Sequence, residues 1–212
     1  METNRAAKVV KGIEGLVSDR EYVLNNCMIK VVSGFRNMGK LDGVPHRMHC
    51  DLAELCILRV EIEGAGIGRA VAIINQGIIN RVGIGEDELF EAARRNTAKK
   101  LVLLNFSQVM NRALTDDDWQ IYMATNQECL YGGAAIVFPD FLKTVSERIR
   151  DDLWIIPSSI HEILIVPKSS GMNPVDIKKI VETVNRNMVS FDETLSDNVY
   201  ETDKDGNLKV AV

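Results

Sequence analysis

The 212-residue sequence contains no run of about 18 apolar residues, the length needed to cross a lipid bilayer. Its first residues, Met1 to Lys8, lack the apolar core of a secretory signal. No block of lysine and arginine is longer than two residues, and the formal net charge is −5, so the basic footprint of a nucleic-acid-binding protein is missing. We expect a cytoplasmic protein that binds neither a membrane nor nucleic acid.

Cysteine is scarce, at four residues, and no two of them have the Cys-x-x-Cys spacing. Neither a zinc ribbon nor a disulfide framework is indicated, and a reducing compartment is the natural setting. By contrast, apolar side chains make up 46% of the chain, which is enough for a hydrophobic core and excludes disordered and fibrous classes. At about 150 residues per domain, the length permits one large domain or two small ones.

In the first half, the spacing of apolar residues predicts a helix over 4–16, a strand over 22–32, and two further strands at 60–63 and 69–74. A glycine-rich turn joins the last two strands, which is typical of a β-hairpin. Acidic residues at 86–88 then predict the start of a helix, because negative side chains stabilise the positive end of a helix.

The second half repeats this order of short strands followed by a helix. Proline at a first helical position costs no hydrogen bond, because the N–H there has no partner within the helix. After about residue 190 we expect a polar tail. Before it, the pattern predicts strands at 119–125 and 131–138, a helix from Pro139 to about Arg150, strands at 153–156 and 162–166, and a last helix that begins at Asn173–Pro174.

Most strand connections are too short for parallel crossovers, so the sequence predicts an α+β fold in which helices pack on largely antiparallel sheets. The order of elements also fits two similar α+β subdomains with a boundary near residue 115. We therefore expect an N-terminal helical segment (1–19), two α+β subdomains (20–114 and 115–190) and a polar C-terminal tail (191–212).

Histidine and cysteine gather at His46, His49, Cys50 and Cys56, which are residue types that bind zinc. The two histidines are an odd number of residues apart, so a strand would turn them to opposite faces, and no distal motif completes a ligand set. We expect no metal site here. The glycine-rich run at 64–68 lacks the third glycine and the following helix of a dinucleotide-binding loop, so we predict no cofactor.

A hydroxyl, an imidazole and a carboxylate come together in the segment 157–162. These are the residue types of a nucleophile, a base and the group that orients the base. Residues so close in sequence rarely align as a catalytic triad, so the same side chains can instead bond to the turn or form a binding surface. The candidate catalytic residues are Ser158, Ser159, His161 and Glu162.

Several short segments of the chain together resemble a known family: Val44–Arg47 with Asp51–Leu52, Thr125–Asn126 with Gly132–Ala134, Ile156–Glu162, and Leu195–Tyr200. The sequence resembles, over about residues 20–200, an uncharacterised bacterial family that is catalogued only as a domain of unknown function. This resemblance implies no activity, cofactor or substrate. It does imply that His46, Arg47 and Asp51 lie in the family's motifs, and we take these three as candidate binding residues.

Two functions stay open. Because no complete catalytic constellation can be assembled, the sequence favours a non-catalytic intracellular bacterial module that binds a protein or a small ligand. The alternative is a hydrolase, in which Ser158 or Ser159 would lie within about 3 Å of a histidine, with Asp51 or Glu162 behind that histidine. We expect any site to lie where the segments 45–51 and 157–162 converge.

A third possibility is that the chain is an assembly subunit. Such a subunit would present a large apolar interface to other copies of itself. A protein partner and a homo-oligomer are therefore both open as partners.

Overall fold

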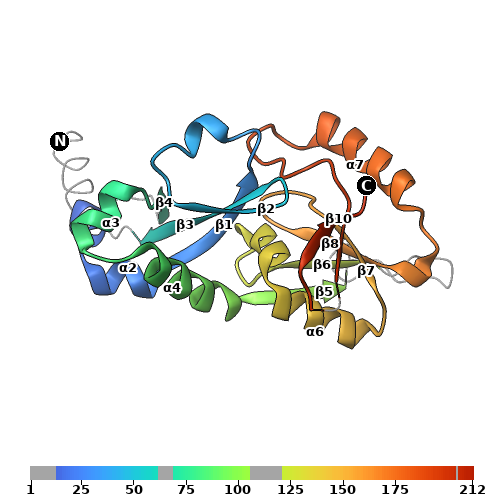
Figure 1. The fold of residues 1–212 in the computed structure, drawn as a ribbon, viewed down its shortest axis with the longest axis horizontal. Helices are drawn as coiled ribbons and strands as arrows, with labels where there is room; N and C mark the ends of the chain where they lie inside the picture. The colour runs from blue at the N-terminus through green and yellow to red at the C-terminus, as the bar shows by residue number, and fades with distance from the viewer. Residues whose placement is uncertain (1–12, 62–68, 106–120, 204) are drawn as a thin grey trace. The chain divides into compact units, whose positions relative to one another are not determined.

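The structure is a computed structural model that describes residues 13–61, 69–105, 121–203 and 205–212 (Figure 1). Contacts between residues divide the chain into two compact units. The first consists of Met1–Ile29, Met38–Arg47 and Leu55–Lys99, and the second of Lys30–Asn37, Met48–Glu54 and Lys100–Val212. The subdomain boundary expected near residue 115 lies outside the described residues.

One sheet has four strands, and three of its strands, β1, β2 and β3, contribute residues to both units. Strand β3 pairs with all three others in this sheet, and its pairing with β4 is antiparallel, as the predicted hairpin requires. The strands are β1 (Cys27–Ser33), β2 (His46–His49), β3 (Leu52–Glu61) and β4 (Arg69–Ile73).

The helices of the first unit include α2 (Arg20–Asn26), α3 (Gln76–Val82) and α4 (Glu86–Ala98). The acidic residues predicted to begin a helix form the first turn of α4. At its other end, the side-chain amide of Asn96 donates to the carbonyl oxygens of Leu24 and Cys27, at 2.9 and 3.0 Å. These bonds hold the end of α4 against the junction of α2 and β1. The short 3-10 helix η1 (Met38–Lys40) lies between β1 and β2 in the chain.

The strand predicted over 22–32 is wrong in its first part, because residues 20–26 form helix α2. Asp19 accepts a hydrogen bond from the Tyr22 N–H at 3.0 Å and so caps the helix. An aspartate at this position satisfies a donor that the helix itself leaves without a partner. Apolar composition alone did not reveal this helix, and only the part from Cys27 onward is extended.

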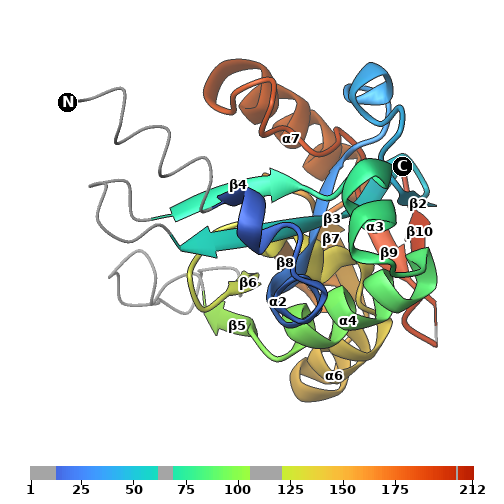
Figure 2. The ribbon, with the colours of Figure 1, turned by 90° about the vertical axis from the view of Figure 1, so that its left-hand side faces the viewer.

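The second unit contains a six-stranded antiparallel sheet in the order β10-β9-β7-β8-β6-β5. Figures 1 and 2 show α6 (Pro139–Ile149) and α7 (Pro174–Met188) on opposite sides of this sheet. The strands are β5 (Leu101–Asn105), β6 (Tyr122–Asn126), β7 (Leu153–Ile156), β8 (Ile163–Pro167), β9 (Tyr200–Thr202) and β10 (Leu208–Val210).

Helix α7 covers one face of the sheet through Ile177 and Val181, which are buried against Ile156, Val166 and Val199. As predicted, the helix begins at Asn173 and Pro174, and the Asn173 side chain accepts from the Val175 N–H at 2.9 Å. Proline at the first position of α6 is confirmed as well. A further 3-10 turn, η3 (Lys168–Ser170), leads from β8 toward α7.

The strand predicted over 131–138 is wrong, because Gly132–Val137 form the buried 3-10 helix η2. A buried apolar run has the same composition in either conformation, so periodicity could not decide between them. The packing around Gly132 and Gly133 explains why these two positions carry no side chain. A Cβ on Gly132 would lie 2.3 Å from the Thr125 hydroxyl oxygen, and one on Gly133 would lie 2.6 Å from the carbonyl oxygen of Ser159.

The segment expected to be a polar tail contributes strands β9 and β10 to the sheet. Leu195, Val199 and Tyr200 within it are all fully buried. The segment is polar in overall composition, and these three buried residues do not form a continuous apolar run. For this reason the sequence pattern did not predict a strand here.

The expected fold class is confirmed, since helices accompany two antiparallel sheets in an α+β arrangement. None of the helices in the described residues combines the length and the apolar character needed to traverse a bilayer.

Candidate functional site

In the turn that joins β7 to β8, polar side chains form hydrogen bonds within the turn. The hydroxyl of Ser159 donates to the Glu162 carboxylate at 2.8 Å and accepts from the His161 N–H at 3.0 Å. The backbone N–H of Ser159 also donates to the Glu162 carbonyl at 3.1 Å. Ser159 is buried, whereas Ser158 is half-buried beside it. Of the candidate residues, Ser159 and Glu162 therefore close the turn.

The imidazole of His161 points toward a different segment. Its Nδ1 accepts the backbone N–H of Tyr131 at 3.2 Å, and its Nε2 lies 3.5 Å from the Glu193 carboxylate. In the neutral ring this assignment places the proton on Nε2, because Nδ1 acts as an acceptor. The Tyr131 ring lies beside the imidazole, with centroids 5.6 Å apart, and the Lys30 ammonium lies 4.8 Å from the centre of the Tyr131 ring.

In the described residues, no serine hydroxyl is hydrogen-bonded to a histidine ring nitrogen. The candidates Ser159 and His161 are brought together, but through the histidine backbone N–H. This contact organises the turn and does not activate the hydroxyl, because a nucleophile needs the base itself in hydrogen-bond reach.

Of the candidates at 45–51, His46 and Arg47 belong to the first unit. The exposed His46 ring bonds to the Val44 carbonyl at 2.8 Å. The Arg47 guanidinium pairs with Asp87 at 2.8 Å and lies 4.2 Å from the centre of the Phe90 ring. Both side chains therefore have partners on their own unit.

Asp51 belongs to the second unit, as does the 157–162 turn, but its carboxylate bonds elsewhere. Ser196 donates to one of its oxygens at 2.6 Å, and the Tyr200 hydroxyl donates to the other. Burial raises the pKa of the Tyr200 phenol, and the hydrogen bond to Asp51 raises it further. Asp51 thus holds the segment 195–200, and no hydrogen bond in the described residues joins it to the turn.

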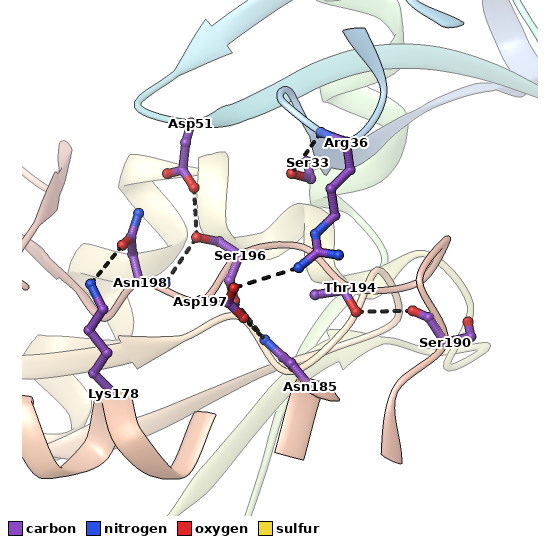
Figure 3. A network of polar contacts seen from close by, with 10 residues as sticks. All are labelled: Ser33, Arg36, Asp51, Lys178, Asn185, Ser190, Thr194, Ser196, Asp197 and Asn198. Atoms are coloured by element: carbon purple, nitrogen blue, oxygen red, sulfur yellow. Dashed lines mark hydrogen bonds and ion pairs between the residues drawn. The ribbon is translucent and has the colours of Figure 1, made fainter. Parts of the chain in front are cut away.

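A network of polar contacts extends from Ser196 to helix α7 (Figure 3). Asn185 donates to the Ser196 carbonyl at 3.0 Å and to the Asp197 carboxylate at 2.8 Å. Arg36 lies 3.6 Å from the same carboxylate, and Lys178 donates to Asn198 at 3.2 Å. Every one of these side chains has a partner within the network, which makes the network structural.

The metal-ligand residue types at 46–56 form no cluster of three in the described residues. His49 instead bonds to Glu54 across the β2–β3 hairpin, with 2.7 Å between Nε2 and the carboxylate. The Glu54 side chain is fully buried, so this histidine orients a carboxylate inside the unit.

Strand β5 is the last strand of the six-stranded sheet in the described residues, and residues of β5 and helix α6 together line a groove. One part of it has a volume of about 340 Å³. The second part has a volume of about 280 Å³. The first part is lined by Leu101, Val102, Leu103, Phe141, Thr144, Val145 and Arg148. The second part is lined by Leu103, Asn105, Tyr122, Arg148 and Ile149.

Local sequence explains the two walls of this groove. Residues 101, 103 and 105 lie on one face of β5 because a strand turns alternate side chains the same way. The lining residues of α6 follow at three- and four-residue spacing, which is one face of a helix. All five residues of β5 are only half-buried, although four of them are leucine or valine. The groove is therefore an incompletely covered apolar edge.

Comparison with known proteins places the chain in a family. A model described as a family of unknown function (DUF5688) matches residues 4–204. The chain belongs to this family. The resemblance to a family of unknown function is thereby confirmed, and membership in DUF5688 carries no activity with it. Comparison with curated proteins and with solved structures gives no match.

Sequence analysis of this DUF5688 member missed the groove. The run of leucine and valine at 101–104 predicts a strand, but whether a strand is inner or outer depends on its neighbours. A signal was nevertheless present in α6. Helix α6 has an apolar face, and Arg148 lies on that same face. A cation is expected on the opposite, polar face of such a helix, so its position is a signal that the sequence offered.

Proposed function

We propose that this chain binds an extended peptide segment of a partner protein along the outer edge of β5. The sequence favoured a module that binds either a protein or a small ligand, and this proposal takes the first of these two. The observation that carries the proposal is the half-buried apolar strand β5 at the end of the described sheet, with a groove of ligand-binding size beside it.

The backbone of β5 supports the first half of this recognition. Its residues 101–105 pair with 126–122 of β6 in antiparallel register, and they occupy the end position of the sheet order. An edge strand turns alternate N–H and C=O groups outward, and an added strand satisfies them. Main-chain hydrogen bonds of this kind provide affinity with little dependence on sequence.

The groove supports the second half, because it offers a place for a side chain of the bound strand. Leu103, Phe141 and Val145 provide apolar walls in its larger part. Burying a large aliphatic or aromatic side chain there removes apolar surface from water and stabilises the complex. We therefore expect the bound segment to carry one apolar anchor residue that faces α6.

No contact in the described residues favours the hydrolase alternative. The Ser159 hydroxyl donates to Glu162, and the Nδ1 atom of His161 accepts from a backbone N–H. We infer in addition that the partner is met in the cytoplasm, since all four cysteines are free.

A random peptide display library, selected on the immobilised chain, tests the proposal. Enriched peptides are synthesised and their dissociation constants are measured by calorimetry. The Thr144→Trp variant fills the groove from an exposed position on α6, and we expect it to weaken binding by about tenfold or more, since it removes the anchor's pocket. Lys143→Trp places the same side chain at the neighbouring exposed position, outside the groove lining, and should leave affinity unchanged.

Amide chemical shifts locate the bound peptide. We expect them to change at residues 101–105 on titration. The proposal fails if no selected peptide discriminates Thr144→Trp from Lys143→Trp. It also fails if the chain self-associates through this edge, which sedimentation would detect as a dimer of the wild type that Thr144→Trp converts to monomer.

A further inference from the structure

We infer that the bound peptide carries an acidic side chain two residues away from its apolar anchor, and that Arg148 recognises this carboxylate. This inference rests on the proposed function and adds the chemistry that selects the ligand. The observation behind it is that the groove has two parts of different character, which share Leu103 and Arg148 as common walls.

The two parts lie in succession along β5. Leu101 and Leu103 line the larger part, whereas Leu103 and Asn105 line the smaller one. Tyr122, which faces Asn105 across the β5–β6 register, lines the smaller part as well. The groove is thus apolar beside the start of the strand and polar beside its end.

Arg148 provides the charge in the polar part. It is exposed, lies in the last turn of α6, and takes part in no ion pair within the described residues. A guanidinium presents a planar fork of donors that matches the two oxygens of a carboxylate. A cation that lines a groove without a partner of its own is complementary to an anionic ligand group.

The two-residue repeat of a β-strand determines how many residues separate the acidic side chain from the apolar anchor in the bound peptide. Side chains two residues apart point to the same side of a strand, about 6.6 Å apart along it. Leu101, Leu103 and Asn105 follow this spacing on β5. A strand paired beside them places one side chain over the apolar part and the next on the same side over the polar part. An acid one residue from the anchor would face away from α6.

Fluorescence polarisation with short synthetic peptides tests the inference. The peptides alternate threonine and valine, are acetylated and amidated at their ends, and contain one leucine anchor. Glutamate stands two residues from the leucine, on either side in separate peptides, because both strand directions are open. The comparison peptides carry glutamine at that place, or glutamate one residue from the anchor. We expect the matched glutamate peptide to bind about three- to fivefold more tightly than either comparison, since an exposed ion pair contributes up to about 1 kcal/mol.

The Arg148→Gln variant should abolish this difference and leave the glutamine peptide's affinity unchanged. Lys143→Gln, which removes an exposed charge from the same helix outside the groove, should preserve the difference. A further glutamine peptide is truncated so that its free terminal carboxylate stands two residues from the leucine. If this truncated peptide binds tightly while the matched glutamate peptide binds no better than the glutamine peptide, the carboxylate comes from a chain terminus and the inference is wrong.

Equal binding of the glutamate and glutamine peptides to the wild type overturns the inference but leaves the proposed function standing. If neither peptide binds, or if binding ignores Thr144→Trp, the proposed function itself fails. The two failures are therefore distinguishable in one set of titrations.

Discussion

The hydroxyl of Tyr200 donates a hydrogen bond to the carboxylate of Asp51, a residue 149 positions earlier in the chain. Ser196 donates to the other oxygen of the same carboxylate at 2.6 Å. Tyr200 is fully buried, so water does not replace this bond when it is lost. The carboxylate in the turn after β2 therefore holds the segment that leads into β9, and a residue expected to bind a ligand has a structural role.

Tyr200→Phe should destabilise the chain by about 1–3 kcal/mol, since it removes the buried donor of one oxygen of the half-buried Asp51 carboxylate. The free energy of unfolding in urea measures this. Tyr22→Phe is the matched control, because the Tyr22 hydroxyl makes only a long bond of 3.4 Å to a backbone carbonyl in a half-buried position. Equal losses in the two variants would contradict the role assigned to the Tyr200 bond.

Stability should fall as the pH rises from about 9 toward 11. Burial raises the pKa of the Cys27 thiol to about 11, whereas an unfolded thiol ionises near 8.5. Between these values the unfolded chain has released a proton that the folded chain still holds, so raising the pH favours unfolding. The Tyr200 phenol, whose pKa burial also raises, adds to the loss above about pH 10.

Unfolding free energies at pH 8 and pH 11 measure this effect. Cys27→Ala should reduce the alkaline loss by about 2 kcal/mol, whereas Cys129→Ala, which removes an exposed thiol, should not change it. An unaltered pH dependence in Cys27→Ala would show that other groups cause the loss.

Gly133→Ala should destabilise the second unit by about 2–4 kcal/mol. Its Cβ would lie 2.6 Å from the Ser159 carbonyl oxygen and 2.9 Å from backbone atoms of Ile160, and backbone cannot move aside as a flexible side chain can. Gly39→Ala adds the same methyl group where nothing lies within 4 Å, so its thermal midpoint should stay near that of the wild type. Tolerance of alanine at both positions would refute the close packing of η2 on the 157–162 turn.

Asn173→Ala should cost about 1 kcal/mol, because the side chain caps the first turn of α7. Asn187→Ala is the control within the same helix, since that exposed amide donates only to the Thr183 carbonyl one turn earlier. Denaturant titration compares the two variants. Alanine has a higher helix propensity than asparagine, so Asn187→Ala should not destabilise the chain, and equal losses in the two variants would contradict the capping role of Asn173.

Local chemistry made several elements predictable from sequence. The acids at 86–88 begin α4, Pro139 begins α6, and Asn173 with Pro174 begins α7. Each of these signals acts within one helical turn, so neighbouring residues suffice to recognise it. The antiparallel pairing of β3 with β4 was predictable for the same reason, since the two strands are close together in the sequence.

Contacts between distant segments decided the rest. Gly132 and Gly133 open the 3-10 helix η2, and only glycine fits there because strand β6 and the 157–162 turn leave no room for a side chain. The polar residues of that turn bond mainly to one another and to neighbouring segments, which spacing alone could not distinguish from a catalytic arrangement.

The sequence by itself determined the α+β class, the family and the starts of three helices, because these depend on composition and on signals a few residues long. Only the tertiary structure decided that β5 ends the sheet formed by the described residues, that α6 lies beside it, and that Arg148 lines the groove between them. Such features arise where segments far apart in the chain pack against one another. The free energy of that packing depends on all the segments together, so no single segment of sequence predicts it.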